Sequence, residues 1–305
     1  MYLPTHVRIT EVGPRDGLQN ESRNLATADK IALIRQLAAA GCREIEATAF
    51  VSPKAIPNLA DAAEVMRGTA GLGITRFALV PNARGYARAL DAGADGVTLV
   101  MSATDSHNRK NLNQTMAESM LELAPLAARA RADGLAARLS VSMVFGCPFE
   151  GDPGVERIRA IVGTMAGHGV ERIGLCDTIG IANPRQVHEV VGRLTRDFPG
   201  LEFELHLHDT YGRGLANALA GLQAGVTRFD SAVGGLGGCP YAPGATGNIS
   251  TEDLVAMLDA SGVHTGLELG GLLAASDFLA RQLDTRIASN RWQVHHAQRR
   301  LRQAA

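Results

Sequence analysis

The sequence alternates short β-type runs with longer amphipathic stretches along most of its length, and this alternation constrains the fold more than any other feature. Apolar and period-two runs predict strands at residues 6–12, 44–50, 75–80, 95–100, 138–145, 171–176, 201–208 and 226–232. Amphipathic stretches predict helices at 27–40, 58–67, 82–92, 115–133, 153–167, 184–197 and 212–224. Closed alternation of eight strands with helices favours a (β/α)8 TIM barrel over an open doubly wound sheet.

Further helical segments follow the eighth strand. Residues 251–260 and 269–285 have helical patterns, and a polar, Arg-rich tail ends the chain. No Pro- or Ser-rich linker marks a domain boundary. We therefore expect a barrel domain over residues 1–265 and a helical extension over 266–305 that packs on the barrel.

Charge and cysteine usage exclude several classes of protein. The 305 residues carry 30 Lys and Arg against 31 Asp and Glu, so no basic field is expected for nucleic acid or for an anionic membrane. No apolar run reaches the length of about 18 residues that a membrane-spanning helix needs. The cysteines are far apart, which argues against a disulfide framework and favours a cytoplasmic location: Cys42, Cys147, Cys176 and Cys239.

The seventh strand carries a pair of histidines that can bind a metal ion. In the run from Phe203 to Asp209, period-two alternation directs Glu204, His206 and His208 into the barrel. A lone histidine is more often a hydrogen-bonded core residue. Two imidazoles on one strand face, at the carboxyl end where barrel enzymes build their active sites, favour a metal site instead.

Two further segments supply oxygen ligands at the same rim. Strand one is followed by Arg15 and Asp16, which by themselves are weak evidence for a site, because a surface ion pair in a turn is common. Asn248 ends the loop after strand eight. Asp16, His206, His208 and Asn248 together form a mixed O/N set that suits Mg²⁺ or Mn²⁺.

The loop after strand eight is rich in glycine and contains a cysteine. Six of the 34 glycines lie in residues 234–247, which suits a loop that approaches a ligand closely or moves over it. Most single cysteines are small buried hydrophobes, but the position of Cys239 on this loop favours a reactive thiol. Glu46 and Asp177 also end at the rim, either to orient Arg15 or a proton-transfer group, or to accept hydrogen bonds from loop amides.

Six segments resemble the 3-hydroxy-3-methylglutaryl-CoA lyase family of the DRE-TIM metallolyase superfamily. They are GPRDGLQNE at 13–21, IEATAFVSPK at 45–54, VFGCPFEG at 144–151, LCDTIG at 175–180, HLHDTYGRGLANALAGLQAGV at 206–226 and GLGGCPYAPGATGN at 235–248. The glycine-cysteine loop is the most specific of them, because related condensing enzymes share the RDG and HxH elements but carry a different segment before the Asn.

The resemblance implies a domain type, an activity and a set of roles. The barrel over residues 1–265 would be a catalytic domain of the pyruvate carboxyltransferase-like type. It implies divalent-cation-dependent cleavage of a 3-hydroxy-3-methylglutaryl-CoA-type thioester to acetyl-CoA and acetoacetate, as in leucine degradation and ketone-body formation. The cation ligands would be Asp16, His206, His208 and Asn248. Catalytic roles would fall to Arg15, Cys239, Glu46, Asp177 and His206, with Arg15 and Gln19 binding substrate. Arg15 would polarise the thioester carbonyl and Cys239 would donate a proton.

Departures from the family pattern leave the acyl group open. The family usually shows a Ser-Glu-x-Phe stretch before Lys-Asn-Ile-Asn, whereas residues 102–113 read SATDSHNRKNLN, with His107 unassigned, and Ser22 replaces a usual Lys. Alternatives are therefore a lyase for 3-hydroxy-3-isohexenylglutaryl-CoA or citramalyl-CoA, a synthase that condenses acetyl-CoA with a 2-oxo acid, and a catalytically silent metal- or CoA-binding barrel.

The sequence leaves the general base open between a histidine, Asp16 and a metal-bound hydroxide. It does not specify an oligomeric state, and a homo-oligomer is compatible with it.

Overall fold

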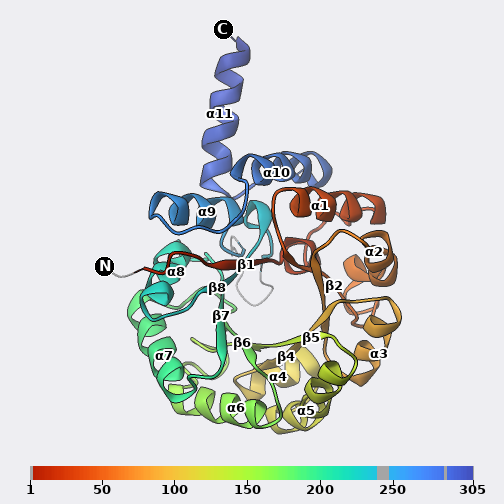
Figure 1. Cartoon of the computed structure of the whole chain (residues 1–305), viewed down its shortest axis with the longest axis vertical. Coiled ribbons are helices and arrows are strands. Elements are labelled where there is room, and N and C mark those ends of the chain that lie inside the picture. Colours follow the sequence, from red (N-terminus) through yellow and green to blue (C-terminus); the bar gives the residue numbers. More distant parts are fainter. Residues whose placement is uncertain (1–2, 239–246, 285–286, 305) are drawn as a thin grey trace.

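Eight parallel strands close into a barrel in sequence order, with helices around the outside (Figure 1). The computed structural model describes residues 3–238, 247–284 and 287–304. Each strand pairs with the next, and β1 closes the barrel against β8. The strands are β1 Arg8–Glu11, β2 Glu44–Ala49, β3 Thr75–Val80, β4 Gly96–Ser102, β5 Ala136–Ser142, β6 Arg172–Asp177, β7 Glu202–Leu207 and β8 Arg228–Ser231. The predicted TIM barrel is confirmed.

The helices of the outer layer follow the strands to which they are connected. They are α1 Thr27–Ala39, α2 Ala62–Gly68, α3 Ala83–Asp91, α4 Asp105–Leu112, α5 Met116–Ala132, α6 Val155–Gly167, α7 Pro184–Asp197, α8 Gly214–Gln223 and α9 Thr251–Ala260. A capping box begins α5, in which Thr115 and Glu118 each bond the other's backbone amide. Gly41 and Gly225 have φ values of 99° and 101°, a conformation that suits glycine and turns the chain from helix to strand.

Two helices differ from the sequence expectation. The stretch predicted as one helix at 58–67 begins with a 3₁₀ turn at Pro57–Leu59, and its α-helix starts only at Ala62. Helix α4 was not expected, because its segment has almost no apolar periodicity. It buries His107 and Asn108 instead, and the Asn108 amide donates to the Gln114 and Thr115 carbonyls.

The C-terminal segment forms two helices that differ in their packing. Helix α10 (Leu269–Leu283) packs against α1 and α9. Helix α11 (Asn290–Ala304) contacts α9 and α10 near its start and then extends away from the barrel (Figure 1). The expected packing on the barrel therefore applies to α10 and to the base of α11, where the Trp292 indole donates to Asp277. The boundary at residue 265 stays a prediction.

The barrel interior is unusually polar. Inward positions of a TIM barrel are commonly filled by bulky branched residues. Here, charged side chains from five of the strands are buried, and each forms an ion pair with another of them or with Glu44: Glu46, Arg138, Arg172, Glu204, Arg228 and Asp230. The outward faces of the same strands pack on the helices, as Leu205 does at Gly221 of α8.

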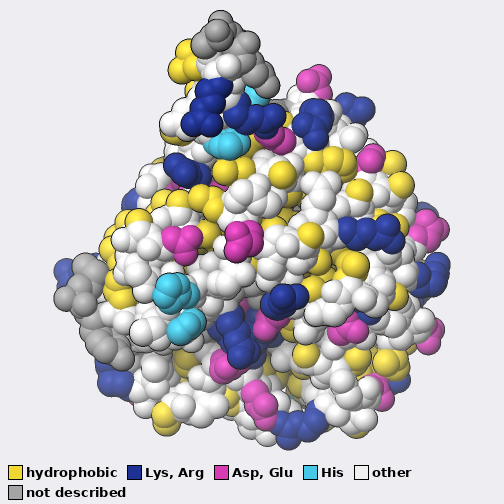
Figure 2. All heavy atoms as spheres, turned by 45° about the horizontal axis from the view of Figure 1, so that its top comes forward, with side chains coloured by type: hydrophobic (Ala, Val, Ile, Leu, Met, Phe, Trp, Pro, Cys, Tyr) yellow, Lys and Arg dark blue, Asp and Glu magenta, His cyan; other side chains and the backbone are white. Residues whose placement is uncertain are grey.

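The outer surface carries both signs of charge. Figure 2 shows acidic and basic side chains interspersed on the face it presents, with arginines gathered on the projecting helix α11. Among the residues that the structure describes, no helix is long and apolar enough to cross a membrane.

Candidate active site

A cavity of about 470 Å³ opens at the carboxyl ends of the strands. Arg15, Asp16, His206, His208 and Gly237 line the part of the cavity that concerns the predicted metal site. These residues come from the segments after β1, from the end of β7 and from the loop after β8. The rim position is the one where TIM-barrel enzymes build their active sites.

Three of the four predicted ligands meet at one point. The Nε2 atoms of His206 and His208 are 3.2 Å apart, and each lies 3.7 Å from Oδ2 of Asp16. Candidate ligand atoms of these residues all lie within 4.8 Å of one another. The structure therefore brings the turn after β1 and the end of β7 together at one place.

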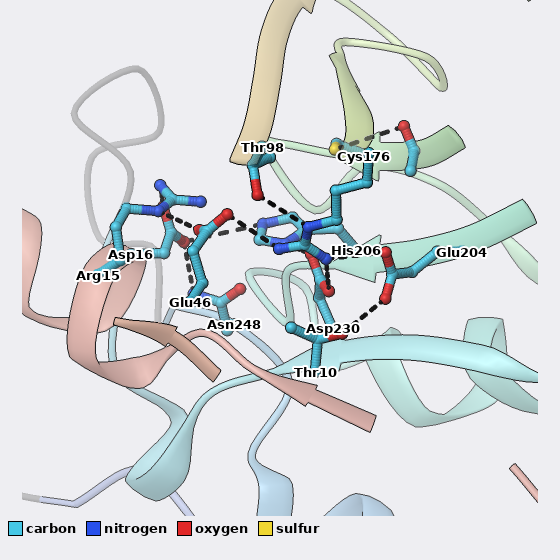
Figure 3. Close-up of polar contacts among 12 residues, drawn as sticks. Thr10, Arg15, Asp16, Glu46, Thr98, Cys176, Glu204, His206, Asp230 and Asn248 are labelled. Atoms are coloured by element: carbon cyan, nitrogen blue, oxygen red, sulfur yellow. Dashed lines mark hydrogen bonds and ion pairs between the residues drawn. The ribbon is translucent and has the colours of Figure 1, made fainter. Parts of the chain in front are cut away.

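Asn248, the fourth predicted ligand, lies beside this cluster. Its Nδ2 donates to Asp16 Oδ2 at 2.7 Å and to the Leu236 carbonyl at 3.0 Å (Figure 3). A β-bridge between His208 and Asn248 ties the two segments together. Gly237 allows the close approach, because a Cβ there would overlap Asn248 Nδ2, and its φ of 104° also favours glycine.

The donor set fits a divalent cation. Asn248 Oδ1 is buried and has no hydrogen-bond partner within the described residues, although an unpaired buried carbonyl oxygen is costly. A carboxylate oxygen, two imidazole nitrogens and this amide oxygen are the ligands that hard or borderline divalent ions accept.

A carboxylate behind His206 fixes how that imidazole is oriented. His206 Nδ1 lies 3.1 Å from Oδ2 of Asp230, which is buried on β8. An Nδ1–H donated to the carboxylate leaves Nε2 unprotonated toward the cluster, as metal-ligating histidines require. Sequence reasoning missed Asp230, although its inward position on the eighth strand was readable from the period-two pattern.

Arg15 is held between two carboxylates at the edge of the same cluster. Its Nε donates to Glu46 Oε2, and its Nη1 donates to Asp16 Oδ1 at 2.5 Å (Figure 3). Burial by itself would lower the pKa of Arg15, but Glu46 and Asp16 raise it overall. Arg15 and the two histidines hold the pKa of Asp16 well below its usual value although burial opposes this. Both groups are therefore charged at neutral pH.

The sequence left two roles open for Glu46 and Asp177, namely orienting Arg15 or accepting hydrogen bonds from loop amides, and each carboxylate takes a different one. Glu46 contacts Arg15. The Asp177 carboxylate instead accepts hydrogen bonds from the amides of Ile181 and Ala182 and does not line the cavity. Burial raises the pKa of Asp177 to about 6, since the amide bonds only partly offset the desolvation.

Polar side chains from other segments also line the cavity, alongside apolar ones such as Leu79 and Val100. His107, Asn111 and Ser142 line it together with Gln19, which was predicted to bind substrate. His107 Nδ1 lies 2.6 Å from Ser102 Oγ, and burial lowers the pKa of His107 to about 4, so this imidazole is neutral.

The predicted reactive thiol, Cys239, lies on a loop that the structure describes only in part. Cys239 lies outside the described residues, but Gly237 and Gly238, which precede it, line the cavity. Cys176 also lines the cavity, and burial raises the pKa of its thiol, so it stays neutral.

Known proteins resemble the chain over nearly its whole length. Residues 6–279 match the family described as HMGL-like. The chain is 44% identical to hydroxymethylglutaryl-CoA lyase YngG of Bacillus subtilis, over 96% of this chain and 99% of that protein. It is 41% identical to the human mitochondrial hydroxymethylglutaryl-CoA lyase, over 94% and 89% of the two chains.

Solved structures give the same picture. An HMG-CoA lyase from Bacillus subtilis superimposes with a TM-score of 0.94 at 44% identity, covering 97% of this chain and all of that one. An HMG-CoA lyase from Acinetobacter baumannii, solved with coenzyme A and 3-methylmalate, gives 0.89 at 41% identity and covers 94% of both chains.

Proposed function

The chain belongs to the HMGL-like family, and from that premise we propose that it cleaves 3-hydroxy-3-methylglutaryl-CoA to acetyl-CoA and acetoacetate. It acts as a carbon–carbon lyase. The observation that carries the proposal is the cluster of Asp16, His206 and His208 beside Arg15 on one cavity. A divalent cation, which we propose to be Mg²⁺ or Mn²⁺, would be held by these three side chains and Asn248.

The reaction breaks one carbon–carbon bond and moves one proton. The tertiary hydroxyl loses its proton to a base, its oxygen becomes the ketone of acetoacetate, and the bond to the carbon next to the thioester breaks. The electron pair of that bond forms the thioester enolate, which then takes a proton at carbon to give acetyl-CoA. When bound, the cation would act as a Lewis acid and as a template for the substrate's oxygen atoms.

Arg15 stabilises the negative charge that develops on the thioester oxygen. Its guanidinium lines the cavity and remains protonated, because Glu46 and Asp16 raise its pKa. Those two carboxylates also fix its direction before substrate arrives. A preorganised charge of this kind favours the transition state over the ground state.

Cys239 is proposed to protonate the enolate carbon. The support is the resemblance of its loop to the lyase family and the position of Gly237 and Gly238 on the cavity wall. We expect Cys239→Ala to keep cation affinity and lose turnover. Full activity of this variant would remove the acid role.

The 3-methyl substrate is proposed over longer-branched ones. The support is that proteins named hydroxymethylglutaryl-CoA lyase resemble the chain over nearly its whole length at 41–44% identity. The cavity lining contains both polar side chains, such as Asn111 and Ser142, and apolar ones, such as Leu79 and Val100, so the substrate panel described below is the test of the acyl group. By the same proposal the enzyme is cytoplasmic and serves leucine degradation or ketone-body formation.

A thioester panel tests the proposal. Purified protein with Mn²⁺ is given 3-hydroxy-3-methylglutaryl-CoA, 3-hydroxy-3-isohexenylglutaryl-CoA and citramalyl-CoA, and kcat/KM is compared. The highest value is expected for the first substrate. A higher value for either of the others would reassign the acyl group, and release of free CoA from acetyl-CoA and a 2-oxo acid would instead indicate a synthase.

A further inference from the structure

The layer of side chains just below the cavity contains a buried arginine. Inward positions on β5 are Arg138, Ser140 and Ser142. Ser140 and Ser142 line the cavity, whereas Arg138 does not and is only 1% exposed. Arg138 therefore does not reach a molecule in the cavity, and any effect it has on the reaction passes through other side chains.

The Arg138 guanidinium bonds to side chains from four other strands. Its Nη2 donates to Glu46 Oε1 at 2.9 Å, and its Nη1 donates to Asp230 Oδ1 at 2.6 Å and Glu204 Oε2 at 2.8 Å. Its Nε donates to Thr98 Oγ1 at 2.9 Å. Figure 3 shows Glu46, Thr98, Glu204 and Asp230 converging on one point beside His206, each from a different part of the barrel.

Two of these partners, Glu46 and Asp230, each use one carboxylate oxygen for Arg138 and the other for an active-site residue. Glu46 Oε2 accepts from Arg15 Nε, and Asp230 Oδ2 faces His206 Nδ1 at 3.1 Å. Each carboxylate therefore bridges Arg138 to one functional group. The Arg138 guanidinium therefore contacts both carboxylates that orient the site: Glu46, which holds Arg15, and Asp230, which faces His206.

We propose that Arg138 is a positioning residue that sets the orientation of Arg15 through Glu46 and of His206 through Asp230. The expected effect on kcat rests on the proposed function. The rigid, planar fork of arginine holds two carboxylates at a fixed angle, which a lysine ammonium cannot do. Arg138→Lys keeps the charge but loses that geometry.

The same barrel offers a matched control. Arg172 on β6 is also buried and bonds to Glu204, Glu44 and Thr10. The structure gives it no hydrogen bond to Glu46 or Asp230. Arg172→Lys should therefore disturb the buried network as much as Arg138→Lys without disturbing the two bridges.

The experiment measures Mn²⁺ affinity by titration calorimetry, kcat and KM with the thioester, and the unfolding midpoint for both variants. Both are expected to lower the midpoint. Arg138→Lys is also expected to weaken Mn²⁺ binding by about 10- to 100-fold and to lower kcat more than it raises KM. Arg172→Lys should stay within about threefold of wild type in affinity and kcat.

Two results would overturn the inference. One is a folded Arg138→Lys with unchanged Mn²⁺ affinity and kcat, and the other is an equal loss in both variants, which would indicate a structural role alone. Should Arg138→Lys fail to fold, Thr98→Val replaces it, since this change removes one acceptor of the Arg138 fork and no charge. Weaker Mn²⁺ binding is then expected, and unchanged binding would overturn the inference.

The Mn²⁺ titration separates this inference from the proposed function. Wild-type protein that binds Mn²⁺ but cleaves no thioester would refute the function. The comparison of Mn²⁺ affinities would still decide whether Arg138 positions the cation site.

Discussion

Replacing Glu46 by glutamine tests how the active site holds Arg15. The Glu46 side chain is fully buried between two guanidinium groups, accepting from Arg15 Nε with one oxygen and from Arg138 Nη2 at 2.9 Å with the other. Glutamine has the same size and keeps one acceptor oxygen, but it removes the negative charge from between the two cations. Among the described residues, Arg15 then keeps Asp16 alone as a charged partner.

The expected losses follow from these contacts. A hydrogen bond to a charged group contributes about 1.5–3 kcal/mol, and if that energy holds Arg15 against the developing enolate, kcat falls by about 10- to 150-fold. KM changes little, because the lost interaction is made in the transition state. Breaking a buried ion pair costs about 3–5 kcal/mol of stability, which for a chain of 305 residues lowers Tm by about 5–8 °C.

The assay is steady-state cleavage of 3-hydroxy-3-methylglutaryl-CoA with saturating Mn²⁺, alongside calorimetric unfolding. Glu44→Gln is the control, because Glu44 lies two positions earlier on the same strand face and bonds to Arg172 and Arg228 instead of Arg15. The control should lose stability and keep kcat within about threefold of wild type. A folded Glu46→Gln with wild-type kcat would refute the account of Arg15.

Three further predictions concern stability and cation binding. Burial raises the pKa of Glu11 from 4.5 to about 8, so the folded protein keeps a proton that the unfolded chain releases, and the free energy of unfolding should fall as pH rises through this range. Denaturant titrations at several pH values should show a smaller fall in the free energy of unfolding for Glu11→Gln than for wild type, with a difference of at most about 5 kcal/mol. Parallel pH profiles for the two proteins would contradict the raised pKa of Glu11. Adding Mn²⁺ to chelator-treated protein at 100 times its Kd should raise stability by about 2.7 kcal/mol and Tm by about 4 °C, and Asp16→Ala should abolish the shift. Gly237→Ala should weaken Mn²⁺ affinity by about 10-fold or more, because the added methyl group displaces Asn248. Gly134→Ala is the control, since its backbone also has a positive φ but no atom lies near the added methyl group, and its Mn²⁺ affinity should not change. Equal affinities in the two variants would contradict the role of Gly237.

Much of the fold could be predicted because the chain repeats one simple pattern. Each strand is short, apolar on its outward face and followed by an amphipathic helix, so the order of elements determines the barrel. Helix α4 escaped prediction for a physical reason. It is held by buried polar contacts of Asn108 and His107, and hydrophobic periodicity carries no signal for such contacts.

The rim of the site could be predicted, but the layer beneath it could not. His206 and His208 lie at the end of a strand, and Asp16 and Asn248 lie in segments that follow strands, which is where barrel enzymes build their active sites. The contacts below them join residues far apart in the chain, as when Arg138 meets Glu46 across 92 positions. A single sequence shows that such residues point inward, but not which of them pair.

The most direct test of the central claim is product formation by metal-stripped protein as Mn²⁺ is added. With 3-hydroxy-3-methylglutaryl-CoA as substrate, we expect acetyl-CoA and acetoacetate in equal amounts, at a rate that rises with Mn²⁺ to saturation and is absent in Asp16→Ala. Mn²⁺-saturated protein that binds the thioester and releases neither product would contradict the account.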